Sequence, residues 1–247
     1  MGLSLSSNSL RNKSPKMKLI KTCCLLLSFA LLASAKDEKS NLAFGNQVSE
    51  SGIKHSFLIC GNRTVLLNEN SEIIWQTEGY GRDGFVLGNG NILVSVGNVA
   101  KEITREGKLV WSYKLSKGNK ELGTCMRLEN GNTLVAERGV NPQLLEVDKE
   151  GGIAVRVPLQ PDTDNAHMQT RMARKLPSGN YIVPHLLAFA VKEYKPNGTI
   201  VRTIKTDLPE LGGRKQRNWP FTAIHLKGGN LLVNSVSYTH LTLPTNR

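Results

Sequence analysis

An 11-residue pattern recurs four times along this chain of 247 residues, and it constrains the fold more than any other feature. The copies span residues 84–94, 125–135, 173–183 and 223–233, and they align without gaps. Each begins with a small residue, has Leu three positions later, and then reads Gly-Asn before an apolar end. A repeat of this kind indicates an architecture before any single residue is interpreted.

Gly-Asn between two apolar runs is turn chemistry, because Gly adopts positive φ freely and Asn does so at low cost. Each copy therefore predicts a β-hairpin, with an incoming strand A and an outgoing strand B. A second signal follows at 103–111, 147–155 and 194–202, where a polar turn with Gly separates two apolar runs. It predicts a second hairpin, strands C and D. The small first residue suits an innermost strand, crowded near a central channel.

A partial copy precedes the first complete unit, since residues 60–75 superpose on 96–111 at a constant offset. It predicts strands B, C and D of an earlier unit. Four short strands in every roughly 40–50 residues are the unit of a β-propeller blade. We therefore predict an all-β propeller of four-stranded antiparallel blades. The alternatives are a β-sandwich, which does not need aligned hairpins, and an open solenoid, whose repeats are nearer ~20–30 residues.

The N-terminal region reads as a targeting segment. Basic residues at 17–21 precede an apolar stretch at 25–32 and then Ala33-Ser34-Ala35, the order typical of a cleaved signal peptide. The stretch is short for a bilayer span, and Cys23-Cys24 come before most of it rather than at its end, which argues against a lipid anchor. We predict a periplasmic or secreted protein with no integral membrane segment after cleavage.

The last copy does not continue as a blade. After Asn234 the chain reads Val-Ser-Tyr-Thr-His-Leu-Thr-Leu-Pro-Thr, which resembles a translated transposase-type sequencing adapter. The last blade is then expected to hold only its first hairpin, in an incomplete ring of about four to five blades, short of the closed ring that propellers form. The expected organisation is an extraneous extension at 1–16, a signal peptide at 17–35, a polar lead-in at 36–54, blades at 55–235 and an adapter-derived end at 236–247.

The net charge of +12 raises the question of nucleic-acid binding, and the distribution of charge argues against it. Five of the 32 Lys and Arg residues fall before residue 22, and the others are scattered along the strands. There is no basic helix and no aromatic ladder for stacking bases. We predict no nucleic-acid partner and a solvated basic surface, which can attract sulfated or phosphorylated ligands.

Cysteine and histidine usage gives no metal or cofactor signal. Cys60 and Cys125 fall on strands of different units, too far apart for a disulfide, whose Cα atoms must approach within ~7 Å. We interpret both as small core residues. No Cys/His cluster has the spacing of a zinc site, and we predict neither metal nor cofactor.

Propeller geometry sorts the loops by face. The A–B and C–D turns lie on one face, and the D-to-A and B-to-C connections lie on the other, around the channel mouth. The D-to-A connections 156–169 and 203–221 are long, and binding residues concentrate on such loops. We expect distant side chains to meet at this mouth: His167 and His185 as candidate catalytic residues, and Arg138, Arg171, Arg214 and Trp219 as candidate ligand-binding residues.

These residue types fit the chemistry of anions. Histidine acts as acid, base or nucleophile near neutral pH, and the arginine guanidinium matches tetrahedral oxyanions. Each residue also has a structural alternative. An isolated loop histidine is often a surface or hydrogen-bonding residue, and a Trp before Pro, as at Trp219, often caps a core.

Two segments carry a family resemblance. Leu-Pro-Ser-Gly-Asn-Tyr-Ile-Val at 176–183 and Glu-Gly-Lys-Leu-Val-Trp at 106–111 resemble secreted bacterial propellers of the PQQ-like and arylsulfotransferase-like repeat type, over about residues 57–235. The arylsulfotransferase resemblance implies a histidine nucleophile that accepts a sulfuryl group, with further His and Arg residues on its oxygens. His167 is the nearest match to the histidine before the Leu-Pro-x-Gly-Asn hairpin, although its spacing is longer and the paired His-His-Asp is absent.

The quinone-dependent dehydrogenases of this type keep an Asp-x-x-x-Gly-x-x-x-Trp motif in most blades, together with adjacent cysteines. Here Trp ends only two of four units, and the adjacent cysteines lie in the predicted signal peptide. This argues against a PQQ-dependent dehydrogenase.

Three functional hypotheses follow. The first is an exported propeller that binds a small-molecule or protein ligand at the channel mouth, with no assigned activity. The second is arylsulfotransferase-like sulfuryl transfer with a histidine nucleophile, and the third is an envelope-assembly scaffold.

Overall fold

The computed structural model describes residues 47–235 and 238–243. The described residues belong to one compact unit. The predicted extension, the signal peptide and the first part of the lead-in therefore lie outside the described residues, and these predictions stay predictions.

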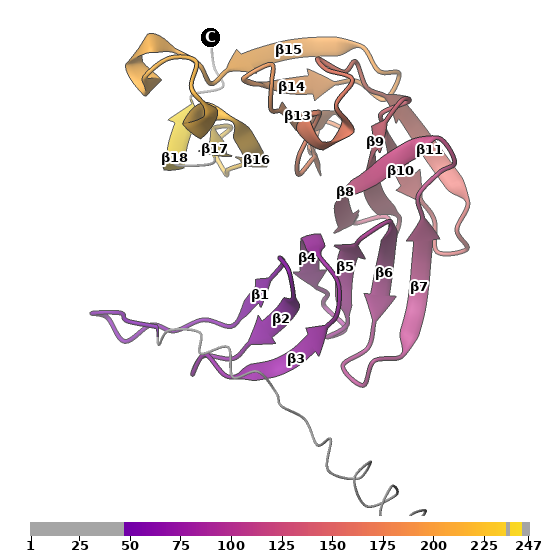
Figure 1. Cartoon of the computed structure of the whole chain (residues 1–247). Coiled ribbons are helices and arrows are strands. Elements are labelled where there is room, and N and C mark those ends of the chain that lie inside the picture. The colour runs from indigo at the N-terminus through magenta and orange to yellow at the C-terminus, as the bar shows by residue number, and fades with distance from the viewer. Residues whose placement is uncertain (1–46, 236–237, 244–247) are drawn as a thin grey trace, which may run out of the picture. The chain divides into compact units, whose positions relative to one another are not determined.

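Five antiparallel sheets follow one another along the chain, and the strands of each sheet pair in chain order (Figure 1). The first sheet contains β1 (Phe57–Ile59), β2 (Thr64–Leu67) and β3 (Ile73–Thr77). The second contains β4 (Gly81–Val86), β5 (Ile92–Val96), β6 (Val99–Ile103) and β7 (Leu109–Lys114). The third contains β8 (Asn119–Arg127), β9 (Thr133–Gly139), β10 (Gln143–Val147) and β11 (Ile153–Pro158).

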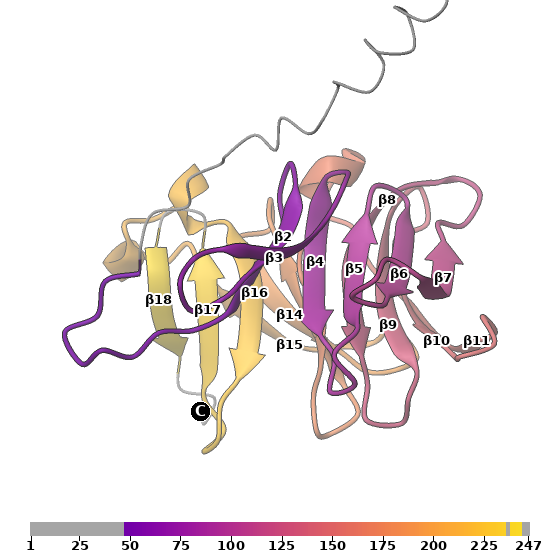
Figure 2. The same ribbon diagram turned by 90° about the horizontal axis from the view of Figure 1, so that it is seen from below.

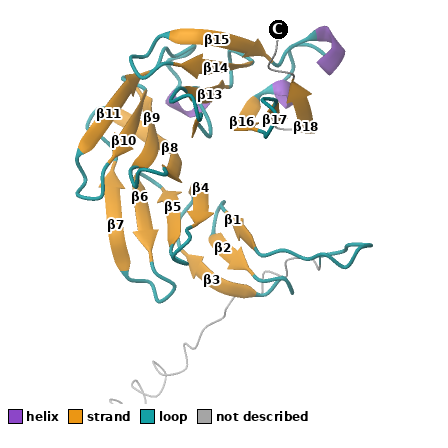
Figure 3. Ribbon diagram, turned by 180° about the vertical axis from the view of Figure 1, so that it is seen from behind, coloured by secondary structure: helices purple, strands orange, loops and turns teal. Residues whose placement is uncertain are grey.

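The fourth sheet contains β12 (Arg174–Lys175), β13 (Tyr181–His185), β14 (Ala190–Tyr194) and β15 (Ile200–Lys205). The fifth contains β16 (Pro220–His225), β17 (Leu231–Ser235) and β18 (Tyr238–Leu243). Three short 3₁₀ helices, η2 (Ala166–Met168), η3 (Pro209–Leu211) and η4 (Gln216–Asn218), lie in the connections between sheets (Figure 3).

The four Gly-Asn corners have the same geometry, which explains the repeat. In the first copy the Leu87 N–H donates to Asn91 O and the Gly90 N–H donates to Leu87 O, both at 2.8 Å. The same two bonds recur in the other three copies. The glycine of each corner has a φ between 84° and 87°, a left-handed conformation that a side chain would strain. The four hairpins β4–β5, β8–β9, β12–β13 and β16–β17 are therefore one structural unit used four times.

The hairpin register also matches the pattern, because the first and last residues of the repeat lie opposite each other. Gly84 pairs with Val94, and the equivalent pairs form in the copies that contain Cys125 and Ala223. A Cβ on Gly84 would lie 3.1 Å from the Cys60 Sγ and from the Leu93 carbonyl oxygen, so this position is crowded. The small residues therefore belong to the innermost strands, as predicted.

The β-propeller prediction is confirmed, and the described sheets do not close a ring (Figure 1). The partial copy forms β1–β3. The last sheet differs from the prediction of a single hairpin, because β18 pairs with β17 and adds a third strand. This pairing satisfies the second edge of β17 and does not test the origin of residues 236–247, of which 236–237 and 244–247 lie outside the described part.

The hydrophobic core lies between neighbouring sheets rather than in one central cluster. Leu93 and Ala100 of the second sheet pack against Cys125 and Val135 of the third, and similar clusters join the other neighbours. Cys125 is a buried free thiol in this cluster. Each blade is thus held by its neighbours.

The two ends of the strands differ, as propeller geometry predicts. The tight hairpin turns after β4 and β16 lie at one end, and the helical connections lie at the other (Figure 2). We call these the turn face and the mouth. The connection from β11 to β12 and the connection from β15 to β16 both reach the mouth.

Candidate functional site

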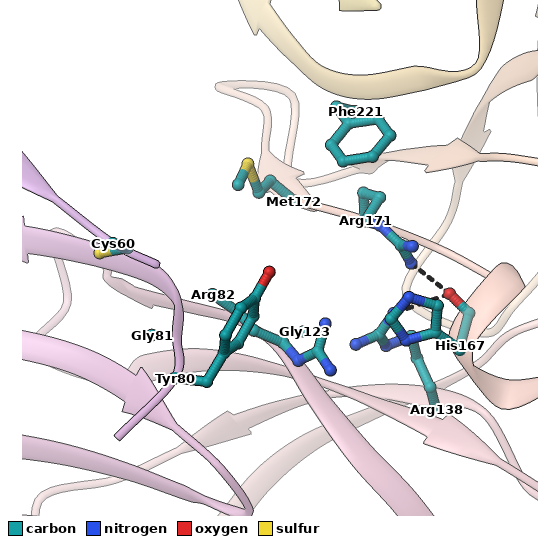
Figure 4. A pocket seen from close by; sticks show the side chains of 10 residues that line it. All are labelled: Cys60, Tyr80, Gly81, Arg82, Gly123, Arg138, His167, Arg171, Met172 and Phe221. Atoms are coloured by element: carbon teal, nitrogen blue, oxygen red, sulfur yellow. Dashed lines mark hydrogen bonds between the residues drawn. The ribbon is translucent and has the colours of Figure 1, made fainter. Parts of the chain in front are cut away.

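A hollow of about 290 Å³ lies at the mouth, and segments of all five sheets reach it (Figure 4). We call it the mouth pocket. Four of its lining residues occupy one repeat position, nine before the closing Asn of each unit: Arg82, Gly123, Arg171 and Phe221. The repeat thus places one residue per blade on the pocket wall.

Arg138 on β9 lies wholly buried beside the pocket. Its Nη2 donates to Glu121 Oε2 at 2.7 Å, and its Nη1 donates to the main-chain oxygens of His167 and Thr170, each at 3.3 Å. Its Nε has no hydrogen-bond partner among the described residues. A Cβ added to Gly123 would lie 3.5 Å from this Nε. Burial, and next the charge of Arg171, lower the pKa of Arg138 to about 9.

Arg171 lies just before β12 and lines the pocket. Its Nη1 donates to the His167 carbonyl oxygen at 2.5 Å and to the Thr170 carbonyl oxygen at 2.9 Å (Figure 4). Its Cζ lies 5.1 Å from the centre of the Phe221 ring, a cation–π contact. Burial, and next the charge of Arg82, lower its pKa to about 10.

Glu121 is the carboxylate that faces these cations. Its Oε2 lies 3.0 Å from the Arg82 Nη2 and accepts from Arg138, and its Oε1 lies 3.4 Å from the His167 Nδ1. Two guanidinium groups therefore share this carboxylate, and the third, that of Arg171, lies near enough for the charge of Glu121 to act on it. The charges of the three guanidiniums exceed that of Glu121, in surroundings where charge is less screened than in water.

The connection from β11 to β12 is built to hold this arrangement. The Gln169 side chain donates to Gly139 O and accepts from the Gly139 N–H, each at 2.9 Å, as a strand partner would. Asn165 caps η2 by accepting from the His167 N–H at 3.1 Å. The carbonyl oxygens of His167 and Thr170 are thereby fixed beneath the two guanidiniums.

Three of the six predicted site residues meet at the pocket. His167, Arg138 and Arg171 line it, although they come from different elements. The other three do not line it: His185, Arg214 and Trp219. Of the predicted residues, Arg138, His167 and Arg171 therefore lie together at this pocket, and the roles of all six stay predictions.

His185 is fully buried at the end of β13, which removes it from contact with a ligand in the mouth pocket. Its Nδ1 lies 2.6 Å from Asp162 Oδ2, and its Nε2 lies 3.0 Å from the Tyr194 hydroxyl. Lys192 donates to both oxygens of Asp162, at 2.7 and 2.8 Å. We call these four side chains the His185 cluster.

The pKa values of the cluster follow from burial and pairing. Burial lowers the pKa of His185 below its ordinary value of 6.5, against the opposing effect of Asp162. Burial alone would raise the pKa of Asp162, but the hydrogen bonds and charges of His185 and Lys192 together hold it at about 2. The neutral imidazole and the ionised carboxylate are therefore the favoured states.

Arg214 and Trp219 pack around Phe189 instead. Arg214 donates to Asp207 at 3.1 Å and to Leu187 O at 2.8 Å, with its Cζ 4.5 Å above the Phe189 ring. The Trp219 ring centre lies 6.4 Å from that of Phe189. This is the capping role that the sequence offered as the alternative for Trp219.

Sequence reasoning missed Arg82, Glu121 and Gln169. The repeat register could have found Arg82, because it occupies the same repeat position as Arg171. No comparable signal existed for Glu121 or Gln169, whose roles depend on contacts with segments distant in sequence.

Among residues 47–235 and 238–243, no group of three or more His, Cys, Asp and Glu side chains could hold a metal ion. In the same part of the chain no helix combines the length and apolarity needed to cross a membrane.

Known structures share this fold. A protein of unknown function from Bacteroides caccae is 25% identical, with a TM-score of 0.64 over 78% of this chain and 73% of that chain. The WD40 β-propeller domain of Doa1 is 13% identical, with a TM-score of 0.55 over 75% of this chain and 58% of that domain. Virginiamycin B lyase from Staphylococcus aureus is 13% identical, with a TM-score of 0.51 over 76% and 64%. The likeness to the Doa1 domain and to virginiamycin B lyase shows only that this chain shares their fold.

One sequence family also matches, and its description is "Mal s 1 allergenic protein-like". The match covers residues 88–242, from β5 of the second sheet to β18 of the fifth. No curated protein matches the sequence.

Proposed function

The chain belongs to the Mal s 1 allergenic protein-like family, and from this premise and the mouth pocket we propose that its propeller binds a small ligand bearing an oxyanion. The ligand class is a compact organic molecule that carries a sulfate, phosphate or carboxylate group. The observation that carries the proposal is the set of three guanidiniums at one pocket, with the Glu121 carboxylate in contact with two of them.

The charge of the pocket favours an anion. Arg82, Arg138 and Arg171 bring three positive charges, and Glu121 compensates one of them. Desolvated guanidiniums that crowd one another are stabilised by a further negative group, and their planar donors suit an oxyanion. The unpartnered Nε of Arg138 is one donor that such a group could use.

The rest of the lining is suited to an organic body. Tyr80, Met172 and Phe221 line the pocket beside the arginines (Figure 4). A volume of about 290 Å³ suits a small molecule at the lower end of the usual range of about 300–1,000 Å³. The pocket thus combines a charged wall with an apolar one.

Calorimetric titration tests the proposal, with 4-nitrophenyl sulfate as the probe and Arg171→Gln as the variant. Loss of charge-assisted hydrogen bonds of about 1.5–3 kcal/mol is expected to weaken binding by about tenfold or more. The matched control is Arg105→Gln, because the Arg105 Nε donates to Gly90 O at the turn face, away from the mouth. Equal weakening by both variants, or by neither, contradicts the proposal.

Sulfuryl transfer is a second candidate, and one observation favours it. The His167 ring is 54% exposed at the pocket, with Nδ1 toward Glu121, which leaves Nε2 as the free nucleophile. The Nε2 lone pair would attack the sulfur of an aryl sulfate, forming an N–S bond. The bond between the sulfur and the aryl oxygen would break, and the phenolate would leave and take a proton from water. An acceptor hydroxyl would then lose its proton to the hydroxide that remains and take the sulfuryl group, which restores the imidazole.

Release of 4-nitrophenolate in the presence of a phenol acceptor separates the two candidates. Transfer predicts turnover that His167→Asn abolishes and that the control His55→Asn retains, since His55 lies outside the pocket lining. Binding without turnover supports ligand binding and contradicts sulfuryl transfer.

Export of the protein remains part of the proposal, supported by the basic, apolar and Ala-Ser-Ala order of residues 17–35. Cell fractionation with N-terminal sequencing tests it. A mature chain that begins at residue 36 supports export, and an intact chain inside the cell contradicts it.

A further inference from the structure

The His185 cluster joins the mouth pocket to a titratable group that no ligand touches. Segment 160–168 carries Asp162 near its start and His167 near its end. Asp162 is held by the cluster, and the His167 carbonyl oxygen accepts from both Arg138 and Arg171. The position of one pocket wall therefore depends on the anchor at Asp162.

The cluster requires a neutral imidazole. The Tyr194 hydroxyl accepts from the main-chain N–H of Gln160, so its own proton is available to the His185 Nε2. The Nδ1–H then donates to Asp162. A proton on Nε2 would leave two donors facing each other at Tyr194, in a site that water does not reach.

The charges around His185 also oppose a proton. The charged and titratable groups that face it are Asp162 from the connection and Lys192 and Tyr194 from β14. Asp162 and Lys192 already neutralise each other, so an imidazolium would be an additional buried positive charge. Opening of segment 160–168 would give that charge access to water.

We propose that His185 is an acid-sensitive latch: protonation of its buried imidazole favours an open state in which segment 160–168 leaves the His185 cluster, and Arg138 and Arg171 then lose the His167 carbonyl oxygen that accepts from both. This regulation rests on the proposed anion binding at the same pocket. Gln169 and its bonds to Gly139 are not titratable and stay in place, so the opening is local.

The direction of the pH effect follows from linkage. The closed state binds the His185 proton less tightly than the open state, in which the pKa returns toward 6.5. The free energy that favours the closed segment is therefore fully present above a pH of 6.5, and it is lost progressively as the pH falls below 6.5. Because the pKa of Asp162 is about 2, its carboxylate stays ionised through the upper part of this range and does not cause the loss.

The test measures two quantities at about pH 7.5 and about pH 5, on either side of the ordinary histidine pKa. One is the affinity for 4-nitrophenyl sulfate, whose charge is the same at both values. The other is amide hydrogen exchange in 160–168, with β5 as an internal reference. The latch predicts about tenfold weaker binding and faster exchange at the lower pH, confined to this segment. Unchanged exchange in 160–168 overturns the latch.

Two variants assign the effect to His185. His185→Gln keeps one donor and one acceptor but does not titrate, and it is expected to remove most of the pH dependence. His167→Gln, the matched control, leaves the His185 cluster intact and is therefore expected to retain the acid loss. Acid loss that persists in His185→Gln overturns the latch.

Tyr194→Phe serves if His185→Gln does not fold. It removes the donor that favours the neutral imidazole, so the closed state opposes the proton less and the difference in exchange between the two pH values is expected to shrink. An unchanged difference contradicts the latch. If the probe does not bind at neutral pH, the proposed function fails, while the exchange measurement still decides on the latch.

Discussion

Arginine and carboxylate side chains meet at both faces of this propeller, and the two faces differ in how the charges balance. At the turn face two buried carboxylates each pair with one cation from the next blade. The Arg127 Nη2 lies 2.6 Å from the Glu102 Oε2, and Lys175 pairs with Glu146. At the mouth, three guanidiniums line one pocket, and two of them share the Glu121 carboxylate.

This difference separates two uses of the same chemistry. Balanced pairs with buried carboxylates connect neighbouring blades, and they leave no charge for a ligand. The mouth has more cations than carboxylates, and one of its arginines is wholly buried with an unpartnered nitrogen. Substitutions at the turn face should therefore change stability alone, and substitutions at the mouth should change ligand binding as well.

The largest expected effect is on stability, at the turn face. Glu146 is 2% exposed and accepts from Lys175 and Tyr181. Glu146→Ala removes this shared acceptor, and we expect a loss of about 2–3 kcal/mol in the free energy of unfolding, below the full range for a buried pair because Lys175 can reach water. Urea unfolding measures it, and probe affinity should change by less than about twofold. A large loss of affinity would break the comparison between the faces.

The next effect separates stability from binding at the mouth. Glu121→Gln removes the carboxylate that Arg82 and Arg138 share, so we expect about 1 kcal/mol lower stability and about tenfold tighter binding of 4-nitrophenyl sulfate. Opposite signs for the two quantities are the signature of uncompensated charge. Weaker binding in this variant would show that Glu121 organises the site instead of opposing the anion.

The smallest effects compare two glycines. Gly131 at a turn-face corner has a φ of 87°, so Gly131→Ala is expected to lower stability by about 1 kcal/mol without changing binding. A Cβ at Gly123 would meet the Arg138 Nε at 3.5 Å, an ordinary contact, within the pocket wall. Gly123→Ala should therefore leave thermal unfolding nearly unchanged and weaken probe binding by about threefold. The reverse pattern would place the ligand elsewhere.

The parts of the structure that sequence could predict are those that the repeat encodes locally. Leu, Gly and Asn at fixed positions specify the corner, because the two hydrogen bonds that form it join residues at most four positions apart. The hairpins, the blades and the partial first unit followed from it. Residues on one wall of the pocket also share a repeat position, so Arg82 could have been identified together with Arg171.

The rest depends on contacts between segments that no local pattern records. His185 follows an apolar run, and no nearby sequence pattern predicts its contact with Asp162, which is 23 residues away. Glu121 and Arg138 meet across a hairpin, 17 residues apart. The third strand of the last sheet was missed because residues 238–243 carry no repeat signal, yet their backbone pairs with β17.

The most direct test of the central claim is a calorimetric comparison of 4-nitrophenyl sulfate with 4-nitrophenol, in the unmodified chain and in the double variant Arg82→Gln/Arg171→Gln. The account predicts that the sulfate ester binds about tenfold or more tightly than the phenol and that the double variant removes this difference. Equal affinity for the two molecules in the unmodified chain would contradict it.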